Sequence, residues 1–119
     1  MKFNWVTIHI RDTAHSRAFY GDLLGMEIDR EFTQPGGRQF TFFRSEDGMQ
    51  VELIEEPSEE NLVKASGISL GVAVANYDEV LSKAQGLGIV VSGPMVLGGH
   101  LECFNAADPD GVRVQISRA

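Results

Sequence analysis

The 119-residue sequence has few of the features that mark secreted, membrane-spanning or nucleic-acid-binding proteins. Its single cysteine, Cys103, excludes an intrachain disulfide and favours the reducing cytoplasm as location. No apolar run approaches the roughly 20 residues of a membrane span, and the opening MKFNWVTIHI is typical of a strand rather than a signal peptide. Ten basic against seventeen acidic residues give a net charge of −7, which argues against nucleic acid and anionic membranes as partners.

The sequence does contain an internal repeat. Asp12, at the start of a predicted helix, precedes Glu52 by 40 residues, and Asn76, at the start of another, precedes Gln115 by 39. A glycine ends each helix 13 or 12 residues after its start, and another glycine lies four residues before Glu52 and before Gln115. Because the spacing holds through four landmarks, it indicates a tandem duplication. Two such copies are expected to pack as a pseudo-symmetric pair with a cleft between them.

Hydrophobic periodicity predicts a strand, a helix and three further strands in each copy. The first copy has expected strands at 5–10, 26–33, 38–44 and 49–55 and a helix from Asp12 to Gly25. The second has expected strands at 68–75, 89–92, 99–106 and 112–118 and a helix at 77–86. We therefore predict one α+β domain over residues 1–119, with module 1 at 1–57, an acidic linker at 58–67 and module 2 at 68–119. The two βαβββ modules are expected to form a curved mixed sheet around the cleft.

Strand alternation predicts which side chains face this cleft. If the apolar residues of each strand pack under the helices, the intervening residues point to the other face of the sheet. The cleft-facing set then includes Trp5, Thr7, His9, Glu52, Ser69 and Gln115. The repeat matches Trp5 with Ser69 and Glu52 with Gln115. The phenylalanines at 40, 42 and 43 occupy both faces of one strand, so at least one is expected to line the cleft.

The segments SRAFYGDLLGME, VELIEE and DPDGVRVQI resemble the vicinal oxygen chelate superfamily. This superfamily includes glyoxalase I, ring-cleaving dioxygenases, and the bleomycin- and fosfomycin-resistance proteins. The resemblance covers essentially the whole chain. It implies two βαβββ modules and a homodimer, but it is nearly silent on activity because one scaffold hosts many chemistries.

The resemblance also implies a metal site at the four matched positions, from which this sequence departs. Trp5 and Ser69 stand where metal-dependent members carry His, while Glu52 matches a ligand position and Gln115 stands where Glu is usual. One carboxylate and one amide are too few for a divalent cation, so we expect no metal cofactor. If a divalent metal is bound, Glu52 and Gln115 are its expected ligands. His9 lies roughly 13 Å along its strand from Trp5, too far to complete the same site.

Three functional hypotheses follow. The first is a small-molecule-binding protein of the bleomycin-resistance type that holds an aromatic or cationic compound in the cleft. Its expected contacts are Trp5, Thr7, Ser69, Glu102 and Gln115. The second is a lyase, isomerase or dioxygenase-type enzyme that uses Glu52 with a metal or as an acid–base group. The third is a degenerate cleft, plugged by Trp5, with a protein–protein role.

The candidate catalytic residues are Glu52, His9 and His100. His100 and Glu102 lie two apart on a predicted strand and are expected over the cleft as an acid–base pair, unless they form an exposed polar face. Cys103 is expected to face the helices as a small buried apolar residue.

Overall fold

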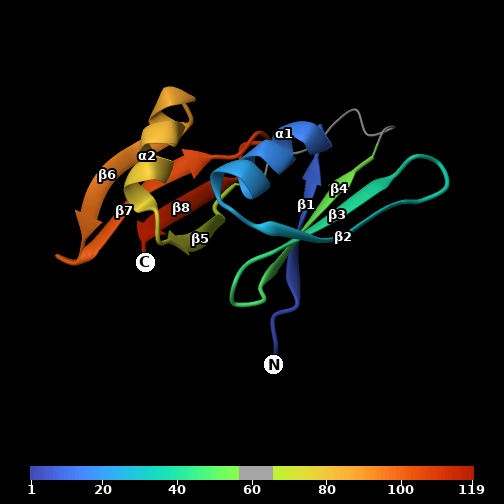
Figure 1. Ribbon diagram of the computed structural model, residues 1–119, viewed down its shortest axis with the longest axis horizontal. Coiled ribbons are helices and arrows are strands. Elements are labelled where there is room, and N and C mark those ends of the chain that lie inside the picture. The colour runs from blue at the N-terminus through green and yellow to red at the C-terminus, as the bar shows by residue number, and fades with distance from the viewer. Residues whose placement is uncertain (57–65) are drawn as a thin grey trace. The chain divides into compact units, whose positions relative to one another are not determined.

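The computed structural model describes residues 1–56 and 66–119, which belong to two compact units, Met1–Val63 and Lys64–Ala119 (Figure 1). Each unit contains one strand, a helical segment and three further strands, so the predicted α+β class and tandem βαβββ modules are confirmed. The predicted linker at 58–67 lies outside the described residues except for its last two positions. No helix in the described ranges is long and apolar enough to cross a membrane.

Module 1 is a four-stranded mixed sheet with helical turns on one face. Its elements are β1 (Trp5–Ile10), α1 (Thr13–Arg17), the π-helix η1 (Ala18–Leu23), β2 (Glu27–Thr33), β3 (Gln39–Arg44) and β4 (Gln50–Glu55). The strand order is β1-β4-β3-β2, with β1 parallel to β4 and the other pairs antiparallel. Tyr20, Phe43 and Leu53 form the centre of its core, each at most 1% exposed.

Module 2 repeats this arrangement. Its elements are β5 (Ser69–Val74), α2 (Tyr77–Gly86), β6 (Val90–Leu97), β7 (Leu101–Ala107) and β8 (Arg113–Arg118). The strand order is β5-β8-β7-β6, again with the first pair parallel and the others antiparallel. Val80, Phe104 and Ile116 form its core.

The first helix differs from the continuous α-helix predicted between Asp12 and Gly25. It begins as expected, because the Asp12 side chain accepts a hydrogen bond from the His15 amide at 3.1 Å. After Arg17 it widens into the π-helix η1, whose last turn is closed by a bond from the Leu24 amide to the Phe19 carbonyl at 3.1 Å. A six-residue apolar stripe is too short to distinguish the π period from the α period, so the sequence pattern did not reveal it.

Strand β6 is longer than the predicted 89–92, since it continues through Gly93 and Pro94 to Leu97. The predicted strand ended just before these two residues. β6 lies at the edge of its sheet, where a proline need not donate to a neighbour, and its pairing with β7 shifts register between Ser92 and Met95. Gly93 has φ +92, and a Cβ there would lie 3.1 Å from the Phe104 Cα, so the strand passes close to β7 only because this residue is glycine.

Candidate functional site

The face of the module 1 sheet opposite α1 and η1 carries a row of four side chains, one from each strand. The ladders pair Thr7 with Glu52, Glu52 with Phe42, and Phe42 with Arg30. Because paired residues point to the same side of a sheet, the row Thr7, Glu52, Phe42 and Arg30 is continuous. We call this set the module 1 row. Its orientation confirms the predicted faces of β1 and β4, since Ile8 and Leu53 on the other side are buried.

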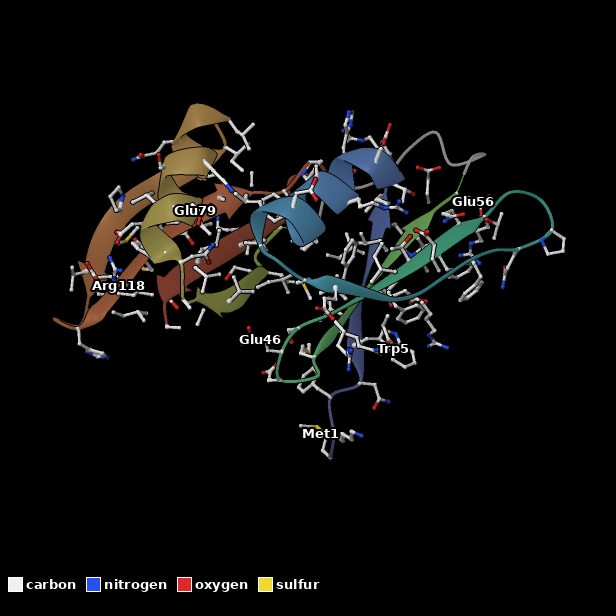
Figure 2. All side chains as sticks on the ribbon, in the orientation of Figure 1. Met1, Trp5, Glu46, Glu56, Glu79 and Arg118 are labelled. Carbon is white, nitrogen blue, oxygen red and sulfur yellow. The ribbon has the colours of Figure 1, made fainter. Side chains whose placement is uncertain are left out.

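Trp5 extends the module 1 row at the N-terminal end of β1 (Figure 2). Its ring meets Phe42 edge to face, with centroids 5.8 Å apart and an interplanar angle of 87°. Phe42 is 3% exposed, whereas Trp5 is 43% exposed. The indole is therefore held by a buried ring while much of its own surface is available, an arrangement suited to stacking on a ligand.

Glu52 lies in the middle of the face and is partly exposed. Its Oε1 accepts a hydrogen bond from the Thr7 hydroxyl at 2.7 Å. Among the described residues, no donor contacts its second oxygen. Thr7 thus fixes the orientation of the carboxylate and leaves one oxygen for a ligand.

A second group of aromatic side chains continues the same face. Phe32 and Phe40 stack with centroids 4.8 Å apart, and the Arg38 guanidinium lies 5.3 Å from the Phe40 centroid. Arg38 also pairs with Glu56 at 3.1 Å. His9 stands in this row opposite Ile54, next along β1 from Thr7. The face thus combines four aromatic rings with one hydrogen-bonded carboxylate.

The corresponding face of module 2 has a different chemistry. The equivalent row is Gly71, Gln115, Asn105 and Ser92, and it carries no charge and no ring. The Asn105 amide donates to the Ser92 hydroxyl at 2.9 Å. Gln115 is partly exposed, and Ser69 lies at the start of β5 on this face as predicted. A ligand here would meet small side chains and neutral hydrogen-bonding groups.

The prediction that Glu102 shares this face is wrong. Cys103 pairs with Ser117 on the face of Gln115, so the preceding residue Glu102 points to the side of α2. Glu102 accepts a hydrogen bond from Arg118, which also donates to Asp78 of α2 at 2.8 Å. Figure 2 shows Arg118 beside this helix. These two carboxylates raise the pKa of Arg118, with the hydrogen bond to Asp78 as the larger cause. Arg118 therefore ties the helix to the sheet, and Glu102 holds the Arg118 side chain in place.

His100 and Cys103 also differ from expectation. His100 lies in the turn before β7, exposed, with Nδ1 3.0 Å from the Gly98 carbonyl, so it forms no pair with Glu102. Cys103 is fully buried as predicted, but it pairs with Ser117 and so faces away from α2. Phe104, which pairs with Ile116 and meets Tyr77 of α2 at 5.8 Å, takes the helix face instead. The predicted alternation along this strand was correct, but its two faces were assigned in reverse.

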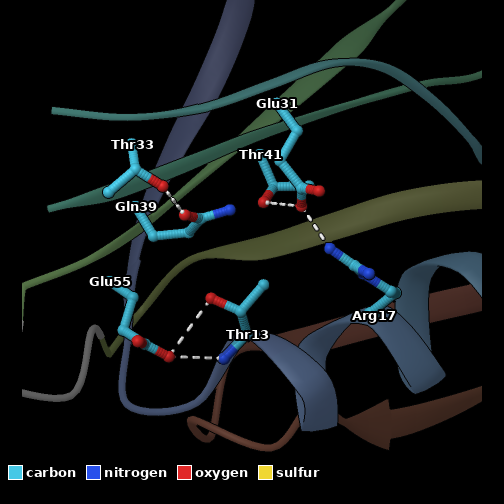
Figure 3. A network of polar contacts seen from close by, with 7 residues as sticks. All are labelled: Thr13, Arg17, Glu31, Thr33, Gln39, Thr41 and Glu55. Carbon is cyan, nitrogen blue, oxygen red and sulfur yellow. Dashed lines mark hydrogen bonds and ion pairs between the residues drawn. The ribbon is translucent and has the colours of Figure 1, made fainter. Parts of the chain in front are cut away.

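Sequence reasoning missed two features of module 1. Arg30 was not predicted, although its guanidinium lies 4.2 Å from the centroid of Phe42. Alternation along 26–33 could have placed Arg30 on the face of Phe42 only if the pairing register between β2 and β3 were known, and the sequence does not give that register. The second feature is a polar network on the helix face, where Glu31 accepts hydrogen bonds from Thr41 at 2.8 Å and from Arg17 (Figure 3).

This network is structural. The bond from Thr41 is the largest cause that lowers the pKa of Glu31 below its ordinary value, and Arg17 lowers it further. Nearby, Glu55 accepts from the Thr13 amide at 2.6 Å and from its hydroxyl at 3.1 Å, at the N-terminus of α1 (Figure 3). A carboxylate at this position satisfies a free amide and complements the helix dipole.

The residues at the matched positions do not fit a divalent metal. Glu52 is the single carboxylate of its row, Thr7 donates to it rather than coordinating beside it, and Trp5 offers only an N–H donor. Among residues 1–56 and 66–119, no group of three or more His, Cys, Asp or Glu side chains could hold a metal ion. We therefore derive no chemistry through a metal.

The sequence profile of the Glyoxalase/Bleomycin resistance protein/Dioxygenase superfamily matches residues 2–116. The chain belongs to this superfamily. The resemblance inferred from the sequence motifs is thus confirmed. No curated protein matches the sequence.

Solved structures of the superfamily share the fold at low sequence identity. The trypanothione-dependent glyoxalase I of Leishmania major has a TM-score of 0.81 at 16% identity over 99% of this chain and 86% of its own. A glyoxalase I mutant from Zea mays has a TM-score of 0.85 at 18% identity over 99% of this chain and 45% of its own. TnmS3, an antibiotic-binding protein from Streptomyces sp. CB03234, has a TM-score of 0.73 at 14% identity, with 99% and 95% covered. The superfamily fold therefore accompanies both enzymes and binding proteins.

Proposed function

We propose that this superfamily member binds a small organic cation with an aromatic group on the helix-free face of module 1, between Trp5 and Glu52. The observation that carries the proposal is a half-exposed indole anchored on the buried ring of Phe42, next to a carboxylate with one uncommitted oxygen. Indole faces attract cations, and a carboxylate beside them supplies the opposite charge.

The geometry favours binding over catalysis. The Thr7 hydroxyl donates a hydrogen bond to Glu52, so the carboxylate is held as a fixed acceptor. Among the described residues, no hydrogen bond or ion pair joins His9 to Glu52. TnmS3 is a precedent within the same fold for a binding protein. A homodimer and a cytoplasmic location are part of the proposal as expectations from the sequence.

The experiment is a fluorescence titration with benzyltrimethylammonium, which does not absorb where tryptophan is excited. The chain has one tryptophan, so its emission reports on Trp5 alone. We expect a saturable change in emission. Glu52→Gln is expected to weaken the affinity about tenfold, the effect of one close opposite charge in a partly exposed site.

Two controls sharpen the test. Glu46→Gln changes the net charge equally but alters an exposed residue in the turn between β3 and β4, so its affinity should match the wild type. Benzyl alcohol, which has the ring without the charge, should bind the wild type and Glu52→Gln equally weakly. An emission change that does not saturate, or equal affinity in the Glu52 and Glu46 variants, would contradict the proposal.

A further inference from the structure

Arg30 is the one positively charged member of the module 1 row. Its guanidinium lies over the Phe42 ring, 4.2 Å from the centroid, on the edge strand β2. Stacking uses the face of the guanidinium and leaves its in-plane N–H groups free for hydrogen bonds. Within the described residues, no carboxylate forms an ion pair with Arg30.

The neighbouring arginines, unlike Arg30, each lie beside a carboxylate. Arg38 is stacked on the next ring of β3, but Glu56 neutralises it at 3.1 Å. Arg44 lies near Asp29 at 3.7 Å. Both carboxylates adjacent to Arg30 in sequence are thus engaged elsewhere. Asp29 pairs with Arg44, and its Oδ2 accepts from Gln50 at 2.8 Å, while Glu31 accepts from Thr41 and Arg17.

Arg30 and Glu52 flank Phe42 from its two sides. Glu52 on β4 pairs with Phe42 on β3, and Phe42 pairs with Arg30 on β2. Two strand spacings place the backbones of Glu52 and Arg30 roughly 10 Å apart. A benzene ring with para substituents spans this gap when its ends meet the two side chains.

We propose that the ligand of module 1 is a zwitterion, with a cationic group at Glu52 and Trp5, a carboxylate or similar planar anion at Arg30, and an aromatic body that spans the distance between these two ends. This inference rests on the proposed function, since it assigns the other end of the same ligand. A guanidinium binds a carboxylate through two parallel hydrogen bonds, so Arg30 would select for this group over a neutral one.

The test compares benzyltrimethylammonium with 4-(trimethylammoniomethyl)benzoate, which differs by one para carboxylate. Calorimetry on the full chain gives both affinities. We expect the wild type to bind the zwitterion about tenfold more tightly, the effect of one charge-assisted pair in a partly exposed site. In Arg30→Gln this ratio should fall to about one, because only the zwitterion loses a partner.

Arg38→Gln is the matched control, because it also removes a guanidinium stacked on a β3 phenylalanine. Its affinity ratio should stay at the wild-type value, since Glu56 already occupies Arg38. If the wild type binds the simple cation but gains nothing from the carboxylate, the zwitterion proposal is wrong and the proposed function stands. If the ratio falls equally in both variants, net charge rather than Arg30 sets it, and the proposal is also wrong. Failure of both probes to bind would overturn both proposals.

Discussion

Module 1 and module 2 have the same strand arrangement but carry different side chains on their helix-free faces. Their strands have the same order, and the ladders β1–β4 and β5–β8, like β3–β4 and β7–β8, have the same register. Each residue of these strands therefore has an equivalent in the other module. On the helix-free face, Glu52 and Phe42 of module 1 correspond to Gln115 and Asn105 of module 2. The backbone arrangement is therefore independent of the chemistry it presents, and the duplicated half-sheet has become charged and aromatic in one copy and neutral in the other.

The helix faces differ in the same way. In module 1, the β3 residue that pairs with Leu53 on the helix face is Thr41, which is fully buried and hydrogen-bonded to Glu31. In module 2 the equivalent position on β7 is Phe104, fully buried under Tyr77. One module thus uses a polar network where the other uses aromatic packing. Each of the following predictions tests one part of this contrast.

The largest effect is expected in the core of module 2. Phe104→Ala should lower the free energy of unfolding by about 3–5 kcal/mol, because it leaves a cavity below Tyr77. Thr41→Val, at the equivalent position of module 1, keeps the volume and should cost only about 1 kcal/mol, through the lost bond to Glu31. Urea denaturation measures both. Equal losses would show that the two cores depend on the same kind of interaction.

The two helices should respond oppositely to added methyl groups. In η1, a Cβ on Gly21 would lie 3.2 Å from the Phe43 ring, which is 1% exposed and cannot move away, so Gly21→Ala should destabilise by about 1–3 kcal/mol. In α2, Gly86 has nothing within 4 Å of such a Cβ, so Gly86→Ala should stabilise by up to about 1 kcal/mol. Thermal denaturation gives both signs. A stable Gly21→Ala variant would mean that the π-helix tolerates a closer approach to β3.

Converting Trp5 to its module 2 equivalent tests the binding surfaces. Trp5→Ser should weaken benzyltrimethylammonium binding about tenfold, since cation–π contacts contribute about 1–2 kcal/mol when partly desolvated. Calorimetry is needed because the variant has no tryptophan. Trp5→Phe keeps a ring and should retain most of the affinity. Binding unchanged in Trp5→Ser would place the cation site elsewhere.

The smallest effect concerns pH. The pKa of Glu31 is lowered in the folded state, mainly by the bond from Thr41 and then by Arg17, so its stabilising contribution is present above the ordinary value of 4.5 and is lost as the pH falls through the lowered value. Its side chain is 29% exposed, so solvent screening limits the contribution to about 1 kcal/mol. Urea midpoints between pH 6 and pH 2.5 should therefore fall more in the wild type than in Glu31→Gln. Glu46→Gln, with the same charge change, should follow the wild type.

The sequence was sufficient for the fold, and for part of the site. The repeat and the alternation in β1, β4, β5 and β8 placed Trp5, Glu52, Ser69 and Gln115 on the predicted faces, because each of these strands has one clearly apolar side. In β7 both sides hold small or apolar residues, so alternation alone left its two faces interchangeable, and Glu102 was placed on the wrong one. Arg30 could not be placed because a bulge between Ile28 and Arg30 shifts the register of β2.

The last residue of each half-sheet carries opposite charge at equivalent positions. Glu55 of β4 accepts from the first turn of α1, while Arg118 of β8 donates to Asp78 in the first turn of α2. In a chain built from two similar copies, a nascent strand can dock into the wrong half during folding. If Arg118 lay at the N-terminus of α1, its positive charge would face the positively polarised free amides of that helix. If Glu55 lay beside Asp78, two negative charges would face each other. We therefore expect these two contacts to disfavour pairing of either strand with the helix of the other copy.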